Sequence, residues 1–358
     1  MILPNLSKWM TTAQPRNPGF SLPLTNSCTC LSPPDQPVLG QMAEGSLILL
    51  STLPFTLLYL LLTVIPLYLT LYCVGIKAPA PLTFLLTTIT VFALYLCPYI
   101  ASTGCPQGDL VLRLTCGTAI MKVLDMYFRR DHPPVIKFPA SPAVYAFYLL
   151  VELRYESFDI STARQRKYAI SDIREYLIHL GIFCILQLLP QVPVIKAFGV
   201  LFSIWLIWNA MNFALKYKDS QPLFGPIYRA PSLSSFWTDT WHNAYTSPIR
   251  TLGYRPMRKL LGPAGGVLGG FGVMAVFHVW SLAPYVPPEG LFRVAVFFMV
   301  NGVGSIVDYW IWEKKDGVVR ALVNWGFEVF WAQWTVQKCD IPDGLFAIDF
   351  KNICRVRR

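Results

Sequence analysis

Long apolar stretches recur along the chain, separated by segments in which polar and basic residues gather. A helix needs about 20 mostly apolar residues to cross a bilayer. One shorter apolar stretch, 140–151, is interpreted as a re-entrant or interfacial piece. The pattern predicts an all-α fold, a polytopic transmembrane helical bundle of about seven to nine spans. The seven expected spans cover residues 46–73, 81–101, 176–194, 198–215, 265–286, 291–311 and 321–336.

Composition agrees with a membrane protein. Hydrophobic residues make up 54% of the chain and charged residues only 14%, whereas a soluble domain carries about 25% charged residues. The net charge of +10 lies largely in three segments between the expected spans, 102–175, 216–261 and 313–320. Basic loops face the cytosol, so we expect these segments there. The expected partner is therefore the lipid bilayer, with no nucleic acid.

Three regions are expected along the chain. They are a flexible, Pro-rich N-terminal leader over 1–45, a membrane-embedded domain over 46–338 and a basic C-terminal tail over 339–358. No cleavable signal peptide is expected, so the first span would direct insertion. The expected location is a multi-pass position in the endoplasmic reticulum membrane. The nine cysteines show no repeated spacing, and no metal site is predicted.

A dense run of glycines lies at the start of the fifth expected span. No strand precedes it and no GK[ST] sequence follows it, which speaks against phosphate binding. The pairs Gly265/Gly269 and Gly266/Gly270 have the small-xxx-small spacing of closely packed membrane helices. We therefore interpret the run as a packing surface.

The chain has four histidines, so each can be considered by itself. His132 lies in a polar loop, and His179 lies at the start of an expected span, where a structural role is favoured. His278 stands fourteen residues into an apolar span, roughly 20 Å from its cytosolic end. An ionisable residue inside the membrane indicates function, although a hydrogen bond between helices is the alternative. A neutral imidazole there would act as a general base.

Residues 231–248 form a second candidate region. Ser232 or Ser234 can cap a short helix that Pro248 ends. On such a helix the aromatic residues at 237, 241 and 245 fall on one stripe, which is suited to the membrane interface. An interfacial anchor would explain the aromatic stripe but not the polar cluster beside it, formed by Asp239, His242 and Asn243.

Three features follow one another in the sequence: Pro-Ser-Leu-Ser-Ser-Phe-Trp-Thr-Asp-Thr-Trp-His over 231–242, Tyr-Arg-Pro-Met-Arg-Lys over 254–259, and an apolar helix with a histidine. This order resembles the wax-synthase-like branch of the membrane-bound O-acyltransferases. The resemblance is best over 222–280. It implies that His278 is catalytic and that His242 occupies the position of an upstream His or Asn. The chain departs from the family pattern at 239–240, where two arginines are common, and at 274–275, where a small Ser-Gly pair is common.

The resemblance implies direct acyl transfer. His278 would take the proton of an acceptor hydroxyl, and His242 with Asn243 would position the donor or stabilise the oxyanion. Asp239 would orient His242, and the supporting residues Trp237 and Trp241 would flank the site. Four basic residues would contact the CoA phosphates, although positive-inside anchoring explains them equally well: Arg250, Arg255, Arg258 and Lys259.

The expected function is an acyl-CoA-dependent O-acyltransferase that esterifies a lipophilic alcohol. The resemblance favours the fungal type, in which acetyl-CoA is the co-substrate and the acceptor is a terpenoid or meroterpenoid of secondary metabolism. No permanently bound cofactor is expected. Three alternatives remain: a long-chain wax ester synthase, a membrane terpene cyclase that uses the carboxyl groups of Asp308 and Glu328, and a transporter, against which no inverted repeat is visible.

Overall fold

The computed structural model describes residues 38–103, 105–134, 140–151, 173–215, 224–241, 244–313 and 317–342. Most of the expected leader and the tail beyond residue 342 lie outside these ranges. Within them the regular structure is entirely helical, which confirms the all-α prediction. Five helical segments are long and apolar enough to cross a membrane, so the chain is an integral, multi-pass membrane protein: Leu53–Gly75, Ala80–Ile100, Pro193–Ala210, Thr246–Leu282 and Pro288–Trp312.

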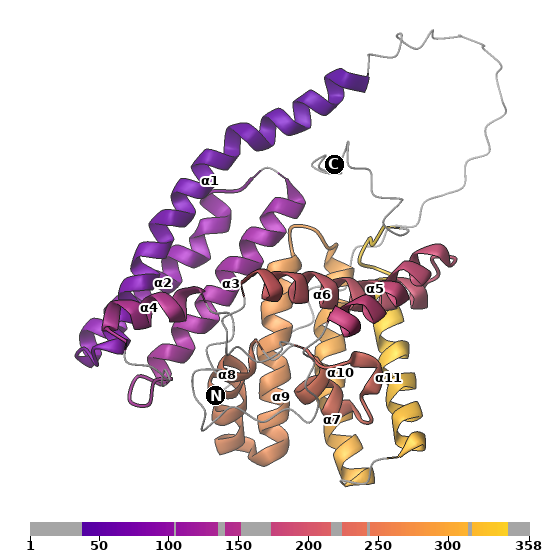
Figure 1. Ribbon diagram of the computed structural model, residues 1–358. Coiled ribbons are helices and arrows are strands. Elements are labelled where there is room, and N and C mark those ends of the chain that lie inside the picture. Colours follow the sequence, from indigo (N-terminus) through magenta and orange to yellow (C-terminus); the bar gives the residue numbers. More distant parts are fainter. Residues whose placement is uncertain are drawn as a thin grey trace, which may run out of the picture. The chain divides into compact units, whose positions relative to one another are not determined.

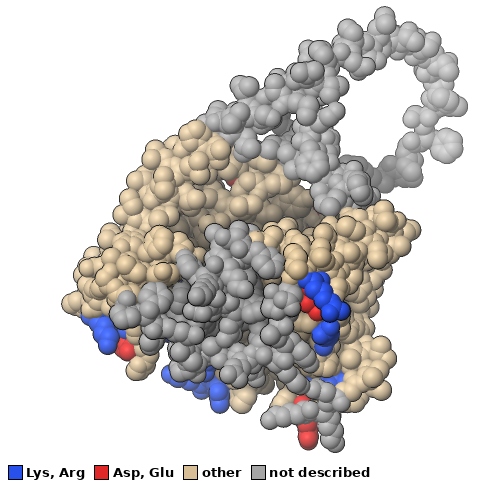
Figure 2. Space-filling model, viewed as in Figure 1, with Lys and Arg blue, Asp and Glu red and all other residues tan. Residues whose placement is uncertain are grey.

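Each of these segments overlaps an expected span. The helices are α1 (Val38–Gly75), α2 (Ala80–Ile100), α6 (Pro193–Leu215), α9 (Arg255–Leu282) and α10 (Pro288–Trp312). Helix α1 begins earlier than predicted, within the expected leader. In Figure 2, the upper part of the described surface is almost entirely uncharged, and most of the visible basic and acidic side chains lie in the lower part of the view. Such a surface is suited to contact with lipid.

Helix α11 (Val318–Val336) matches the last expected span but is not among the five segments apolar enough to cross a membrane. It packs against α10, and α9, α10 and α11 stand side by side in Figure 1. The Arg320 guanidinium on α11 donates two hydrogen bonds, of 2.9 and 2.7 Å, to the Asp308 carboxylate on α10. Asn324 donates a third, of 3.2 Å. Because a bidentate partner satisfies both charges, these polar residues can be buried between the two helices.

The structure places a 23-residue helix, α3 (Pro106–Phe128), inside the segment that we predicted to be a basic loop. Its hydrophobic pattern is interrupted by Asp109, Arg113, Lys122 and Asp125, which made it look like a loop. Each of these side chains has a hydrogen-bond partner within the protein. The Lys122 ammonium, for example, donates a 2.7 Å hydrogen bond to the Leu149 carbonyl. Helix α3 packs against α2 and α9, so it is part of the bundle.

The expected interfacial piece forms the ten-residue helix α4 (Pro142–Val151), whose Leu149 supplies that carbonyl. The expected span over 176–194 corresponds to α5 (Ile173–Leu188), which has only 16 residues. A crossing needs about 20 residues, so α5 is short for one. A turn over 189–192 leads into α6, and α5 and α6 pack against each other.

Helix α9 is bent near its start. Leu261 leaves helical geometry, and Gly262 has a φ of 71°, a conformation that side-chain-bearing residues rarely adopt. Residues before the bend, including α8 (Thr246–Pro248) and the π-helical η4 (Ile249–Tyr254), fold back along the helix that follows it. A Cβ atom on Gly253 would lie only 2.3 Å from the Gly269 carbonyl oxygen. The glycine run is therefore a packing surface, as predicted, and its partner is this preceding segment.

Candidate active site

His278 lies on the lipid-spanning part of α9, four residues before that helix ends at Leu282, or about 6 Å from its end. Its Nδ1 atom is 2.8 Å from the Met274 carbonyl oxygen. A carbonyl can only accept, so Nδ1 carries the hydrogen and Nε2 keeps its lone pair. The imidazole stacks on Phe298, with ring centroids 4.3 Å apart. One ring nitrogen is thus held by the backbone and the other is available for chemistry.

A cavity of about 370 Å³ lies beside His278. Small-molecule sites have volumes of about 300–1,000 Å³, so one ligand of modest size fits. Most of its lining comes from four helices: α6 over 197–204, α9 with His278 and Leu282, α10 over 294–298, and α11 over 325–336. Leu110 of α3 and the segment over 236–241 also line it. From 325 to 336 the α11 face is about 16 Å long. Most of the lining is apolar and aromatic, which favours a lipophilic ligand.

Glu328 supplies a carboxyl group to the same cavity. Its side chain is held by Trp237, whose indole Nε1–H donates at 3.0 Å both to Glu328 Oε1 and to Asn301 Oδ1. Asn301 is fully buried and donates in turn to the Phe297 carbonyl at 3.0 Å. A buried polar network of this kind fixes the orientation of each member. The cavity therefore carries two ionisable side chains, the His278 imidazole and the Glu328 carboxyl.

The 231–248 segment is not the single helix that we predicted. It begins as expected, with Ser232 Oγ accepting a 3.0 Å hydrogen bond from the Ser235 amide. After α7 (Leu233–Ser235) and the π-helical η3 (Phe236–Thr240), the chain turns extended at Trp241, with a ψ of 165°. This break removes the helical periodicity on which the predicted aromatic stripe depended.

The aromatic residues of this segment point to different places. Trp237 and Trp241 both line the cavity, with ring centroids 6.4 Å apart. Tyr245 is buried and shares a 2.9 Å hydrogen bond with the Thr118 hydroxyl on α3. The proposed interfacial stripe is therefore wrong for Tyr245. Trp237 and Trp241 form part of the cavity wall instead.

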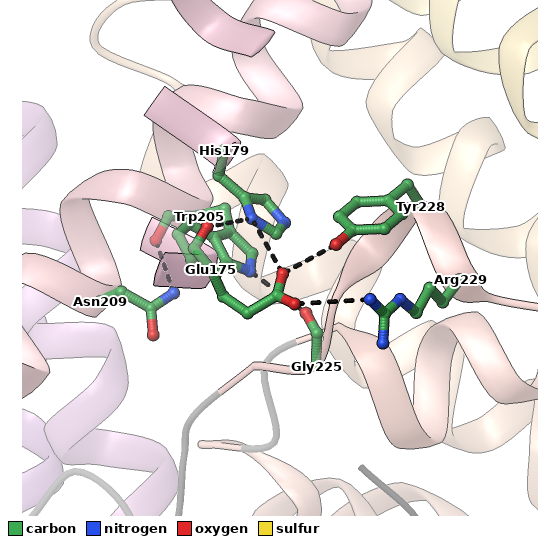
Figure 3. Close-up of polar contacts among 7 residues, drawn as sticks. All are labelled: Glu175, His179, Trp205, Asn209, Gly225, Tyr228 and Arg229. Carbon is green, nitrogen blue, oxygen red and sulfur yellow. Dashed lines mark hydrogen bonds and ion pairs between the residues drawn. The ribbon is translucent and has the colours of Figure 1, made fainter. Parts of the chain in front are cut away.

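A second cluster anchors the loop that carries these walls (Figure 3). The His179 ring of α5 is fully buried and stacks on Trp205 of α6, with centroids 3.6 Å apart and planes 4° apart. Its Nδ1 is 2.7 Å from the Glu175 carbonyl oxygen. The Trp205 Nε1–H donates to the Gly225 carbonyl at 3.2 Å, and the Gly225 amide donates to the Thr240 carbonyl at 2.8 Å. His179 thus has the structural role that we favoured.

The Glu175 side chain ties the same loop to α5. Its carboxylate accepts a 2.8 Å hydrogen bond from the Tyr228 hydroxyl and lies 3.6 Å from the Arg229 guanidinium (Figure 3). Burial, and next the neighbouring carboxylate, raise the pKa of the Tyr228 phenol above its usual value. These contacts act across segments distant in sequence, which is why no local motif predicted them.

The sequence-predicted site residues are only partly placed. His242 and Asn243 lie outside the described residues. Asp239 follows Trp237 in η3 and is partly exposed. Asp308 does not line the cavity, because it is buried in the ion pair with Arg320. Within the described ranges, no three His, Cys, Asp or Glu side chains come together to hold a metal ion.

The four basic residues from η4 to the bend are all exposed. The glycine contacts show where these residues lie along the axis of α9. Ile249 packs on Gly270, and Arg258 packs on Gly266. On the helix axis Gly270 is about 12 Å from His278, and Gly266 is about 18 Å from it. The basic group is therefore on the same helical hairpin as His278 and begins about two helical turns away. It comprises Arg250, Arg255, Arg258 and Lys259.

Sequence reasoning missed most of the cavity wall. Phe298 on α10 stacks on His278, and Phe297 lines the same cavity. In the sequence both looked like ordinary core residues of an apolar span. One signal was present on α11. Trp325, Glu328 and Ala332 are spaced at i, i+3 and i+7, which places them on one helix face. A carboxyl group on such a face marks a surface turned toward a polar partner or a cavity.

Comparison with known proteins returned one family. Residues 220–300 match the model of the membrane bound O-acyl transferase family. No curated protein and no solved structure matches the chain. The matched residues contain the two cavity tryptophans, the basic group, His278 and Phe298. Over these residues the chain is similar to the membrane-bound O-acyltransferases, and its membrane-length helices agree with that similarity.

Proposed function

We propose that the chain is an acyl-CoA-dependent O-acyltransferase that esterifies a lipophilic alcohol, with acetyl-CoA as the donor. The observation that carries the proposal is the setting of His278. Its Nδ1 is engaged by the Met274 carbonyl, which leaves the Nε2 lone pair available beside a largely apolar cavity. An imidazole in this tautomer is a general base placed where an alcohol can bind.

The reaction follows from this tautomer. His278 Nε2 takes the proton of the acceptor hydroxyl while its oxygen attacks the thioester carbonyl carbon. The tetrahedral intermediate then collapses, the carbon–sulfur bond breaks, and the imidazolium returns the proton to the CoA thiolate. The products are the ester and free CoA. His242 and Asn243 are proposed to donate hydrogen bonds to the oxyanion, with Asp239 orienting His242.

The donor is proposed to lie along the α9 hairpin. Arg250, Arg255, Arg258 and Lys259 are exposed and would bind the CoA phosphates. The thioester would then reach His278 through the extended pantetheine arm, over the about 12–18 Å that separates the two groups along the helix. Among the described residues, no acidic side chain forms an ion pair with these four.

The acceptor is proposed to be a terpenoid or meroterpenoid, as in the wax-synthase-like branch that the sequence resembles. The cavity volume of about 370 Å³ is near the lower end of the range for small-molecule sites. With an apolar acceptor inside, little volume remains for a long acyl chain, which favours acetyl over the donor of a wax ester synthase. The endoplasmic reticulum membrane, where both substrates are accessible, is the proposed location.

The test uses microsomes that contain the wild-type chain, His278→Ala or His132→Ala. They receive radiolabelled acetyl-CoA or palmitoyl-CoA and a panel of terpenoid and fatty alcohols. We expect labelled ester from acetyl-CoA with the wild type and with His132→Ala, since His132 is exposed in a loop. Loss in His278→Ala should exceed a hundred-fold. Ester formation that survives in His278→Ala would refute the assignment of the base.

A membrane terpene cyclase is the second candidate, favoured by one observation. Glu328 lines the same cavity as Phe236, Trp237, Trp241, Phe297, Phe298 and Trp325, and aromatic faces stabilise cations. Such an enzyme would use Glu328 as its acid, because Asp308 is committed to Arg320. Cyclisation of an added polyprenyl substrate that is lost in Glu328→Gln but kept in His278→Ala would favour the cyclase.

A further inference from the structure

We infer that Glu328 is a second polar anchor for the acceptor, and that the acceptor carries two oxygen functions on an apolar skeleton: the hydroxyl to be acylated at His278, and a second hydroxyl bound by the Glu328 carboxyl. The inference rests on the proposed function for the role of His278. It adds a specificity-determining residue and narrows the substrate from alcohols in general to compounds of the diol class.

The two anchors belong to one continuous wall. The His278 ring stacks on Phe298 at 4.3 Å, and Phe298 packs against Trp237 with centroids 6.0 Å apart. The Trp237 indole then holds Glu328 Oε1 at 3.0 Å. Two aromatic rings therefore separate the imidazole from the carboxyl along the surface of the cavity. A ligand that lies on these rings can reach both groups at once.

The hydrogen bonds of Glu328 leave part of its acceptor capacity for a ligand. Its carboxyl group interacts with Trp237 and Asn301, and it also borders the cavity. A carboxylate offers about four acceptor positions, so these two neighbours do not occupy all of them. The other groups around the cavity are mostly hydrocarbon and aromatic, so a further partner is best supplied by the bound molecule.

A hydroxyl group fits this position better than other polar groups. It can donate to a carboxylate and accept from a carboxylic acid, so it pairs with Glu328 in either protonation state. A ketone or an ether can only accept, and an amine would carry a charge into an apolar cavity. The network behind the carboxyl, through Trp237 and the fully buried Asn301, keeps it fixed for recognition.

The experiment measures binding and turnover separately, on the purified full chain in detergent. The probes are decanol against decanediol and dodecanol against dodecanediol, each diol with its hydroxyls at the two chain ends. Quenching of tryptophan fluorescence gives the dissociation constants, because Trp237, Trp241 and Trp325 line the cavity. The quantity compared is the ratio of diol to alcohol affinity. Partition into detergent is the same for every variant and cancels between them.

The variants are Glu328→Leu, Glu328→Gln and a matched control, Glu289→Gln, which alters a half-exposed surface carboxylate outside the cavity. Loss of a hydrogen bond to a carboxylate should lower the affinity ratio by roughly 10- to 100-fold in Glu328→Leu. In Glu328→Gln, where a neutral amide replaces the carboxylate, the ratio should fall by about five-fold. The control should leave it unchanged.

An unchanged ratio in Glu328→Leu would overturn the inference, and Glu328→Met, which also lacks a hydrogen-bonding carboxyl group, decides if Glu328→Leu does not fold. Turnover with labelled acetyl-CoA is scored on the same samples. A diol preference that depends on Glu328, without ester formation, would overturn the proposed reaction and leave the anchor standing. Ester formation with no such preference would overturn the anchor alone.

Discussion

The buried ion pair between α10 and α11 gives a quantitative prediction about what holds the cavity together. The Asp308 and Arg320 side chains are only 3% and 4% exposed, and their closest atoms are 2.7 Å apart. Removing one partner leaves the other charge buried, which costs about 3–5 kcal/mol. Replacing both by apolar residues of similar size is close to neutral. We therefore expect Asp308→Leu to be strongly destabilising, and Asp308→Leu combined with Arg320→Met to recover most of that loss.

The assay is the free energy of unfolding from denaturation with sodium dodecyl sulfate in mixed micelles. A matched surface pair provides the control. Glu289 is 55% exposed and lies 3.3 Å from the Lys338 ammonium, so Glu289→Gln should change the free energy of unfolding by less than about 1 kcal/mol. The reasoning is refuted if Asp308→Leu costs no more than this control. It is equally refuted if the double variant is as unstable as the single one, because the cost would then not come from an unpaired charge.

Three further results are expected. Gly253→Ala should lower the free energy of unfolding by about 1–3 kcal/mol, since its Cβ would meet the Gly269 carbonyl oxygen. The control Gly326→Ala, which has no atom within 4 Å of the added Cβ, should be neutral or stabilising. Equal effects of the two substitutions would contradict the close packing at Gly253. Arg258→Gln should raise the KM for acetyl-CoA about two- to five-fold and make that KM less dependent on salt concentration. An unchanged KM would indicate that Arg258 anchors the chain at the membrane surface and does not bind CoA. Folding raises the pKa of Tyr228. Its contribution to stability is therefore complete below the ordinary pKa of 10.0 and is lost as pH rises through the pKa of the folded state. If the melting temperature of Tyr228→Phe falls at alkaline pH as much as that of the wild type, the loss does not come from Tyr228.

The candidate site was only partly predictable, and the reason differs between its parts. His278 stood out because a titratable group in an apolar stretch is costly unless it is used. The cavity walls did not stand out. Trp241 lines the cavity at a point where the chain turns extended, and the anchor for this loop is a stack of His179 on Trp205 and a hydrogen bond to Gly225. Such contacts join residues far apart in sequence and have no local signal.

The sequence by itself determined the membrane helices and the histidine within them. Apolar length and charge are properties of a single segment, and a bilayer selects segments on those properties alone. Only the tertiary structure decided which polar helices join the bundle. Helix α3 carries four charged residues in 23 and was predicted to be a loop, yet Lys122 and its neighbours find their partners on other helices. The role of Glu328 was likewise open until Trp237 and Asn301 met it, since the environment of a buried polar group depends on what packs around it.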